Sequence, residues 1–344
     1  LINGSQSVWQ RSTSQASITT TGYHTADRWR TSISSLGTWT QSRSTDVPSA
    51  QGFGYSLKLD CTTADASPAA SNFHSIGQRI EGQNIQQVLY GTSNAKSLTF
   101  SCWVKSNKTG VYTVEFYKYG TSTQRHIAKE ITIDTANTWE KKTVTIPGDV
   151  TEGVDNDNGL SLEVQIWLGA GTTFTSGTFN NSAWAAVTNA NRISSNQVNL
   201  SDSTSNELYT TGWQLEVGST ASGFEFEPYA ATLTKCLRYN YRLENVSGTN
   251  FVCCGVGTTN SSGVGFHIVP QLIPLRASAT MSYSSLSHFD MEYRDTSPTV
   301  MSLFGANSNG QNLVLQVNQG STGTGECTML MLDQAGWINF DAEL

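Results

Sequence analysis

Hydrophobic and polar residues alternate along much of this chain with the period of two that a β-strand requires. The clearest stretch is SLEVQIWLG, residues 161–169. One face of this stretch is aliphatic and carries Leu162, Val164, Ile166 and Leu168; the other carries Ser161, Glu163, Gln165 and Trp167. The pattern predicts a strand with its aliphatic face in the core and its second face toward solvent, where a tryptophan is unexpected.

The same alternation predicts strands over residues 96–106, 111–120, 126–134, 138–148 and 207–218. In the last of these, Tyr209, Trp213, Leu215 and Val217 are expected to share the core face. Helical signals are confined to residues 81–91, with Ile85, Val88 and Leu89 on one side, and 231–239, with Thr232 as N-cap. Many strands with turn-rich connections predict an antiparallel sandwich or barrel.

The strand pattern pauses near residue 230 and about eight shorter strands follow it. We therefore expect an all-β chain of two domains: residues 1–230 as a jelly-roll β-sandwich, and residues 231–344 as a second, smaller antiparallel β-sandwich.

Composition narrows the possible partners. Charged residues make up 14% of the 344 residues and the formal net charge is −7, so nucleic acid is not an expected partner. No apolar run has the roughly 18 residues needed to span a bilayer, so membrane insertion is not expected either. The chain begins at Leu1, which suggests a further N-terminal segment. Six cysteines without metal-ligand spacing predict reduced thiols.

Several longer segments resemble phage structural proteins of the appendage or tail-fibre type. They are LINGSQSVWQRSTS with HTADRW, FHSIGQRIEGQNIQQVLYGTSNAKSLTFSCWVKS, NTWEKKTVTIPGD, GWQLEVGSTASGFEFEPY, FHIVPQLIPLRASAT and the ending FDAEL. Ala279 stands where that family usually has proline.

The resemblance covers nearly the whole chain and implies a virion protein whose main domain is similar to a carbohydrate-binding jelly roll. It also implies a homo-oligomer, with a trimer as the expected form. This oligomer would be assembled in the host bacterial cytoplasm and joined to other virion proteins through its N-terminal segment. The expected function is host-surface glycan attachment. A capsid decoration or head-fibre protein, and a polysaccharide depolymerase, remain as alternatives.

The sequence contains no recognisable catalytic motif, so we predict no catalytic residues and no enzymatic activity. The feature that most favours an enzyme is FEFEPY, residues 224–229, where Glu225 and Glu227 would share one face of a strand. Glycan hydrolysis needs two such carboxylates. The simpler interpretation is a closing strand whose phenylalanines plug the sandwich.

No cofactor and no metal ligands are predicted. The segment VDNDNG, residues 154–159, offers Asp155, Asp157 and Gly159 for a structural Ca²⁺ ion, but it lacks the glutamate of a calcium loop. A hairpin turn accounts for the same residues.

Aromatic side chains on the polar faces of the predicted strands are the best functional signal, because sugars stack their C–H faces on aromatic rings and bond their hydroxyls to amides and carboxylates. If the strands share a sheet, Lys105, Glu115 and Glu216 lie on the same surface. The predicted glycan-binding residues are Trp103, Tyr117, Tyr119, Glu163, Gln165, Trp167 and Gln214.

The alternative is that this face is covered by protein. Residues 1–50, which contain Trp9, Trp29 and Trp39, could cover it, and so could a neighbouring subunit.

Overall fold

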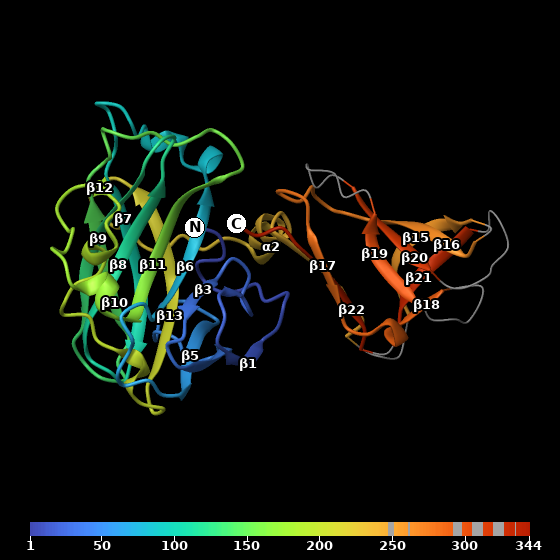
Figure 1. Cartoon of the computed structure of the whole chain (residues 1–344), viewed down its shortest axis with the longest axis horizontal. Coiled ribbons are helices and arrows are strands. Elements are labelled where there is room, and N and C mark those ends of the chain that lie inside the picture. Colours follow the sequence, from blue (N-terminus) through green and yellow to red (C-terminus); the bar gives the residue numbers. More distant parts are fainter. Residues whose placement is uncertain (247–250, 261, 292–297, 305–311, 319–326, 334) are drawn as a thin grey trace. The chain divides into compact units, whose positions relative to one another are not determined.

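The computed structural model describes residues 1–246, 251–260, 262–291, 298–304, 312–318, 327–333 and 335–344. The chain divides into two compact units, one formed by Leu1–Thr232 with Leu344 and the other by Leu233–Glu343. Each unit is described separately below (Figure 1).

The first unit is a sandwich of two antiparallel sheets. The six-stranded sheet contains, in spatial order, β1 (Ser14–Ile18), β4 (Thr38–Ser44), β5 (Ser56–Thr63), β13 (Glu207–Val217), β7 (Leu98–Ser106) and β10 (Glu140–Ile146). The seven-stranded sheet contains β12 (Ala185–Ala186), β9 (Gln124–Ile133), β8 (Gly110–Tyr119), β11 (Leu160–Ala170), β6 (Phe73–Glu81), β3 (Arg30–Ser34) and β2 (Gly22–Tyr23).

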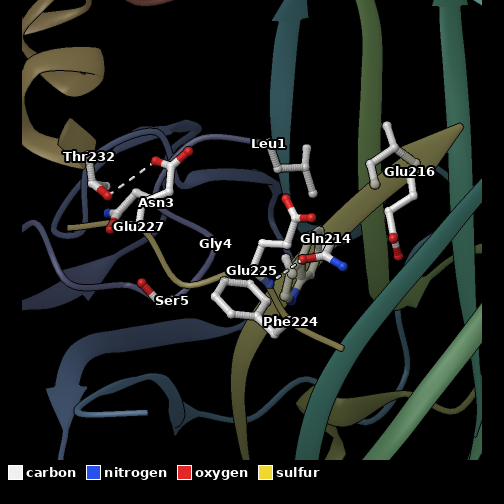
Figure 2. Close-up of a pocket in the computed structure, with 12 residues that line it drawn as sticks. Leu1, Asn3, Gly4, Ser5, Gln214, Glu216, Phe224, Glu225, Glu227 and Thr232 are labelled. Carbon is white, nitrogen blue, oxygen red and sulfur yellow. Dashed lines mark hydrogen bonds between the residues drawn. The ribbon is translucent and has the colours of Figure 1, made fainter. Parts of the chain in front are cut away.

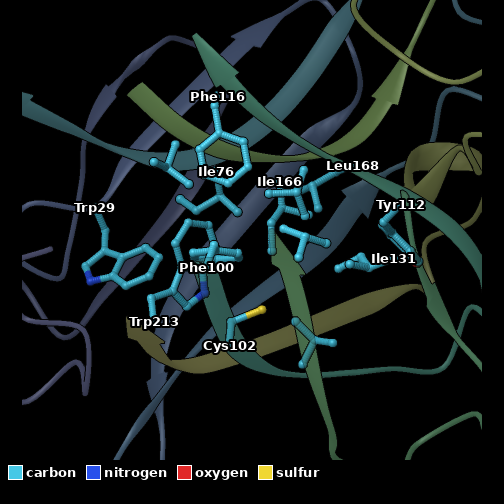
Figure 3. Packing of buried hydrophobic residues seen from close by; sticks show 14 of the residues in the cluster. Trp29, Ile76, Phe100, Cys102, Tyr112, Phe116, Ile131, Ile166, Leu168 and Trp213 are labelled. Carbon is cyan, nitrogen blue, oxygen red and sulfur yellow. The ribbon is translucent and has the colours of Figure 1, made fainter. Parts of the chain in front are cut away.

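The core between these sheets contains the aliphatic face of β11. Leu162, Val164, Ile166 and Leu168 are fully buried there, as the alternation predicts. Figure 3 shows aromatic side chains in the core around Ile166 and Leu168. The rings of Phe100 and Trp213 are 4.8 Å apart. Burial of so much apolar surface is the main force that holds two sheets together.

Residues 1–50 belong to the sandwich and do not form a separate cover. They supply β1 to β4, and Trp29 and Trp39 are fully buried in the core. The ring of Trp29 lies 4.7 Å from that of Trp213, and its Nε1 donates a hydrogen bond to the carbonyl oxygen of Asn3 at 3.1 Å. The sequence pattern did not reveal these strands.

The alternation in β13 is interrupted by a bulge. The register with β7 shifts between Thr211 and Gln214, and Gly212 in between has a φ of +63°, which favours glycine. Trp213 therefore enters the core, whereas Tyr209 lies beside Lys58 and Lys105. The expectation that Tyr209 and Trp213 share a face is wrong. The bulge inserts one extra residue into β13, so the side chains after it point to the opposite face from the one that the alternation predicts.

The short helices also differ from their predictions. Residues 81–91 form two 3₁₀ turns, η1 (Gly82–Asn84) and η2 (Gln86–Val88), and Leu89 is 42% exposed with a φ of +57°. Helix α2 (Tyr229–Leu237) begins directly after Pro228, so Thr232 lies in its first turn and is not an N-cap. The other short elements of the first unit are α1 (Thr172–Thr175), η3 (Asn189–Asn191) and η4 (Leu200–Asp202).

The second unit contains two smaller antiparallel sheets. One has the order β14 (Asn240–Glu244), β22 (Trp337–Asp341) and β17 (Thr280–Tyr283). The other has the order β18 (Phe289–Met291), β21 (Cys327–Leu332), β15 (Val252–Thr259), β16 (Val264–Val269), β20 (Leu313–Asn318) and β19 (Val300–Phe304), and η5 (Leu286–His288) precedes β18. A separate core, with Leu315, Leu330 and Phe340 fully buried, lies in this unit.

The predicted fold class is confirmed: the chain is all-β, with a large antiparallel sandwich followed by a smaller pair of antiparallel sheets. No helix in the part of the chain that the structure describes is long and apolar enough to cross a membrane.

Candidate functional site

The second face of β11, expected to be exposed to solvent, is covered. The four residues of this face are at most 5% exposed, and they are Ser161, Glu163, Gln165 and Trp167. The cover comes from the segment that follows β11, because Phe174 and Ile193 form a small apolar cluster with Trp167. The ring of Trp167 lies 5.6 Å from Phe174 and 5.8 Å from Phe73. Residues 171–193 therefore cover Trp167, whereas Glu163 of the same face is contacted by Arg30, which belongs to residues 1–50.

A fully buried carboxylate, Glu115 of β8, organises the polar groups under this cover. Gln165 and Trp167 donate to its Oε2 from Nε2 and Nε1 at 2.9 and 3.0 Å. Arg192 donates to both carboxylate oxygens, from Nε at 2.8 Å and from Nη2 at 2.9 Å. Burial alone raises the pKa of a carboxyl group, but Arg192 and the nearby His126 lower the pKa of Glu115 to about 2. The carboxylate is therefore ionised, and it holds Arg192 in one orientation.

A cavity of about 220 Å³ lies on the same face of the seven-stranded sheet. We call it the arginine–tyrosine pocket, and its lining residues are Thr21, Arg30, Ser32, Phe73, Arg79, Tyr117, Tyr119, Glu163, Gln165, Trp167, Phe174 and Arg192. Most of them come from strands distant in sequence, which the sheet order β8-β11-β6-β3 places side by side. The residues outside strands are Thr21, Phe174 and Arg192.

Strand register sets the rows of side chains in the pocket. Glu163 of β11 pairs with Tyr117 of β8 on one side and with Arg79 of β6 on the other. In the next row, Gln165 pairs with Gly77, which in turn pairs with Arg30. Gly77 thus places no side chain between the Gln165 amide and the Arg30 guanidinium.

Two arginines share one carboxylate in this pocket. Nη1 of Arg30 lies 3.4 Å from Oε1 of Glu163, and Nε of Arg79 lies 3.3 Å from Oε2. Nη1 of Arg30 also donates to Ser32, and Nη1 of Arg79 donates to the carbonyl oxygen of Leu344 at 3.0 Å. These contacts fix the orientation of both guanidinium groups.

Aromatic rings form the rest of the pocket wall. The guanidinium of Arg192 lies over the rings of Tyr117 and Trp167, 4.8 and 5.0 Å from their centroids. The rings of Tyr117 and Tyr119 are 4.9 Å apart, and the hydroxyl of Tyr117 donates to Gln124 at 2.5 Å. Tyr119 and Phe73 are half-buried, so their rings are the most accessible ones in the pocket.

The seven predicted glycan-binding residues do not form one surface. Five of them line the arginine–tyrosine pocket: Tyr117, Tyr119, Glu163, Gln165 and Trp167. Trp103 and Gln214 belong to β7 and β13 of the other sheet, because strands that alternate alike can belong to either layer of a sandwich. Sequence reasoning missed Arg30, Arg79 and Arg192. Only Arg30 and Arg79 lie within strands, and strand alternation alone gives no sign that they meet Glu163.

Gln214 instead lines a second cavity of about 260 Å³, together with Glu216, Glu225 and Glu227. The backbone nitrogen of Glu225 donates a hydrogen bond to Oε1 of Gln214 at 2.8 Å (Figure 2). The hydroxyl of Thr232 donates to Glu227 at 3.4 Å. Glu225 and Glu227 are both exposed.

Residues 224–229 are not the predicted closing strand, because they form no ladder with a neighbouring strand. The expectation that the phenylalanines plug the sandwich is met only in part, because Phe224 is half-buried but Phe226 is 52% exposed. The rings of Phe224 and Phe226 pack 5.1 and 5.0 Å from that of Phe53.

The loop considered for calcium bends at residues 156–159 and is held by hydrogen bonds from within it and from Gln86. The side chain of Asp157 accepts a hydrogen bond from the backbone nitrogen of Gly159 at 2.8 Å, and the carbonyl oxygen of Asp155 accepts one from Gln86 at 3.1 Å. Within the described ranges, no three His, Cys, Asp or Glu side chains gather in a way that could hold a metal ion.

Comparison with known proteins gives distant structural similarities. No protein-family model and no curated protein sequence matches the chain. A domain of tailspike protein 4 from bacteriophage CBA120 is similar with a TM-score of 0.31 and 11% identity, over 55% of this chain and 19% of that one. The xylan-binding CBM22-2 domain of Paenibacillus barcinonensis Xyn10C has a TM-score of 0.31 and 14% identity, over 55% and 91% of the two chains.

A family 11 carbohydrate-binding module from Clostridium thermocellum, in complex with a mixed-linked tetrasaccharide, has a TM-score of 0.29 and 9% identity. That match covers 63% of this chain and 99% of the module. Similarity this distant carries no conclusion about what the present chain binds.

Proposed function

We propose that the first unit binds a saccharide in the arginine–tyrosine pocket. The observation that carries this proposal is the mixture of groups in one cavity: accessible rings of Tyr119 and Phe73 beside the guanidinium of Arg30 and the carboxylate of Glu163. A sugar ring offers an apolar C–H face to aromatic side chains and hydroxyl groups to charged donors and acceptors.

The pocket is held in one arrangement before any ligand arrives. Glu163 is fixed by two arginines, and Glu115 fixes Arg192 through two hydrogen bonds. Side chains that are already ordered lose little conformational entropy when a ligand binds. This preorganisation supports a binding role, because it lowers the cost of recognising a small polar ligand.

The size of the cavity supports a short ligand. Its volume of about 220 Å³ is below the ~300–1,000 Å³ typical of small-molecule sites. We therefore propose that it receives one sugar unit, such as the end or a side branch of a surface polysaccharide.

For the role of the whole chain, we propose a phage virion appendage that attaches to host-surface glycan without cleaving it. The sequence segments that resemble tail-fibre-type proteins support this role, and they also support a homo-oligomer joined to other virion proteins. Immunogold labelling of intact particles tests this part. Labelling at the tail is expected, and a lattice of label over the head would favour the decoration protein instead.

The saccharide-binding proposal is tested by a glycan array probed with the complete chain. Saturable binding to at least one glycan is expected. Uniform background over neutral and acidic glycans alike, with protein that remains folded by circular dichroism, would overturn it.

A further inference from the structure

The charges that line the arginine–tyrosine pocket are unbalanced. Three guanidinium groups line it, from Arg30, Arg79 and Arg192, against the single lining carboxylate of Glu163. Arg192 is neutralised by Glu115 beneath it, whereas Arg30 and Arg79 share Glu163. One positive charge among these side chains is therefore uncompensated, in a chain whose formal net charge is −7.

Hydrogen-bond donors of two arginines remain available in the pocket. Arg30 uses only Nη1, toward Ser32 and Glu163, and Arg192 uses Nε and Nη2 toward Glu115. Within the described residues, Nη2 of Arg30 and Nη1 of Arg192 have no hydrogen-bond acceptor. Arg79 contributes less, because its Nη1 already donates to Leu344.

The surroundings of Arg30 favour an anion. Its side chain is only partly exposed, and burial together with the neighbouring Arg79 lowers its pKa while Glu163 raises it. A second carboxylate near Arg30 would relieve the repulsion between the two arginines. Guanidinium groups bind carboxylates through short, charge-assisted hydrogen bonds, which are about twice as strong as neutral ones.

We propose that the saccharide bound in this pocket is acidic, with its carboxylate received by Arg30 and its ring against Tyr119 and Phe73. This inference rests on the proposed saccharide-binding function and adds the chemical class of the ligand. A uronic acid or a sialic acid at the end of a glycan has both parts, a carboxylate and an adjacent apolar ring face. A neutral sugar would leave Nη2 of Arg30 without a charged partner, since only its Nη1 contacts Glu163.

The experiment compares matched glycan pairs by titration with the complete chain. The acidic members carry glucuronate, galacturonate or sialic acid, and the neutral members are the same glycans with that carboxylate reduced to an alcohol, or with sialic acid removed. The acidic member of at least one pair is expected to bind about tenfold more tightly than its neutral partner, the gain of one charge-assisted hydrogen bond. Arg30→Gln is expected to remove this preference, whereas Arg43→Gln, an exposed arginine of β4, is expected to leave it unchanged.

The outcomes separate the two proposals. Equal affinity for acidic and neutral members would overturn the acidic ligand and leave saccharide binding in place. An Arg30→Gln variant that weakens both members equally would overturn the assignment of the carboxylate to Arg30, because Arg30 would then bind only hydroxyl groups. No binding to any member would overturn both proposals. If a sulfated glycan binds more tightly than every carboxylated one, the proposal that the pocket receives a carboxylate is contradicted.

Discussion

Trp167 and Glu115 are joined by a hydrogen bond under the covered face of the seven-stranded sheet, from the indole Nε1 to the carboxylate Oε2 at 3.0 Å. Glu115 is fully buried and Trp167 is 2% exposed. The same carboxylate accepts both hydrogen bonds from Arg192. Trp167 therefore acts mainly by supporting the group that positions Arg192, and it offers almost no ring surface to a ligand.

Replacing Trp167 with phenylalanine keeps an aromatic ring under the cover but removes this donor. We expect the free energy of unfolding to fall by about 1–3 kcal/mol, the usual cost of leaving a buried polar group with one partner fewer. Urea denaturation measures the loss. Trp103→Phe is the matched control, because the indole of half-buried Trp103 has no hydrogen-bond acceptor among the described residues. An equal loss in both variants would contradict the role of the Trp167 hydrogen bond.

The buried Glu115 carboxylate makes stability depend on pH in acid. Its pKa is about 2 in the folded chain against an ordinary value of 4.5, so the folded state binds fewer protons between these values. Stability from this group is complete above about pH 4.5 and is lost as the pH falls toward 2, by on the order of 3 kcal/mol in total. We expect Glu115→Gln to be less stable than wild type at pH 7, by about 3–5 kcal/mol, because Arg192 loses its charged partner.

The gap between wild type and Glu115→Gln is expected to narrow steadily from pH 5 to pH 3 in denaturant titrations. Glu225→Gln serves as the control, since Glu225 is exposed. A gap that stays constant over this range would show that Glu115 does not have a lowered pKa.

Gly77 allows β6 to approach β11 closely beside the pocket. A Cβ at this position would lie 2.5 Å from the carbonyl oxygen of Val164 and 2.7 Å from Cβ of Gln165. Gly77→Ala is expected to destabilise the chain by about 1–3 kcal/mol, as overpacking does. It is also expected to weaken saccharide binding, because Gln165 and Arg30 flank Gly77. Gly54→Ala is the control, since a Cβ at Gly54 meets nothing within 4 Å; wild-type stability and affinity in Gly77→Ala would refute this close packing.

The proposed binding role requires no bond cleavage. Incubation of the protein with host capsule or lipopolysaccharide is expected to release no new reducing ends, as measured by a colorimetric reducing-sugar assay. Release of reducing ends that disappears in the double variant Glu225→Gln, Glu227→Gln would instead assign depolymerase activity to the second cavity.

The alternation in the sequence was sufficient to predict β7 to β11, β13 and the core face of β11, because a side-chain period of two is a local property. It did not reveal β1 to β6. It could not predict whether the opposite face meets water. That depends on where residues 171–193 fold back. Phe174 lies in the four-residue α1 and Arg192 directly follows η3, so neither belongs to a segment with a regular pattern. The interpretation that Glu163 and Gln165 face solvent was wrong, because neighbouring strands of the same sheet supply their partners. Arg30 and Arg79 contact Glu163. Gln165 is hydrogen-bonded to Ser75 and Glu115.

The candidate site was predicted only in part for a related reason. Tyr117 and Glu163 could be grouped because both stand on polar faces, and they are indeed register partners. Trp103 stands on the same kind of face, but β7 belongs to the other sheet. Assigning strands to one sheet or the other requires knowledge of contacts between residues far apart in the chain. A single sequence does not contain that information when no regular helices separate its strands.

The most direct test of saccharide binding in the arginine–tyrosine pocket is calorimetric titration of the array's strongest glycan into three proteins: wild type, Tyr119→Ala and Trp103→Ala. Both variants remove one partly exposed aromatic ring, from opposite sheets of the sandwich. Tyr119→Ala is expected to raise the Kd about tenfold, through loss of a stacking surface and its neighbouring contacts. Trp103→Ala is expected to bind as wild type does. Wild-type affinity in Tyr119→Ala, or loss of binding in Trp103→Ala alone, would contradict the placement of the site.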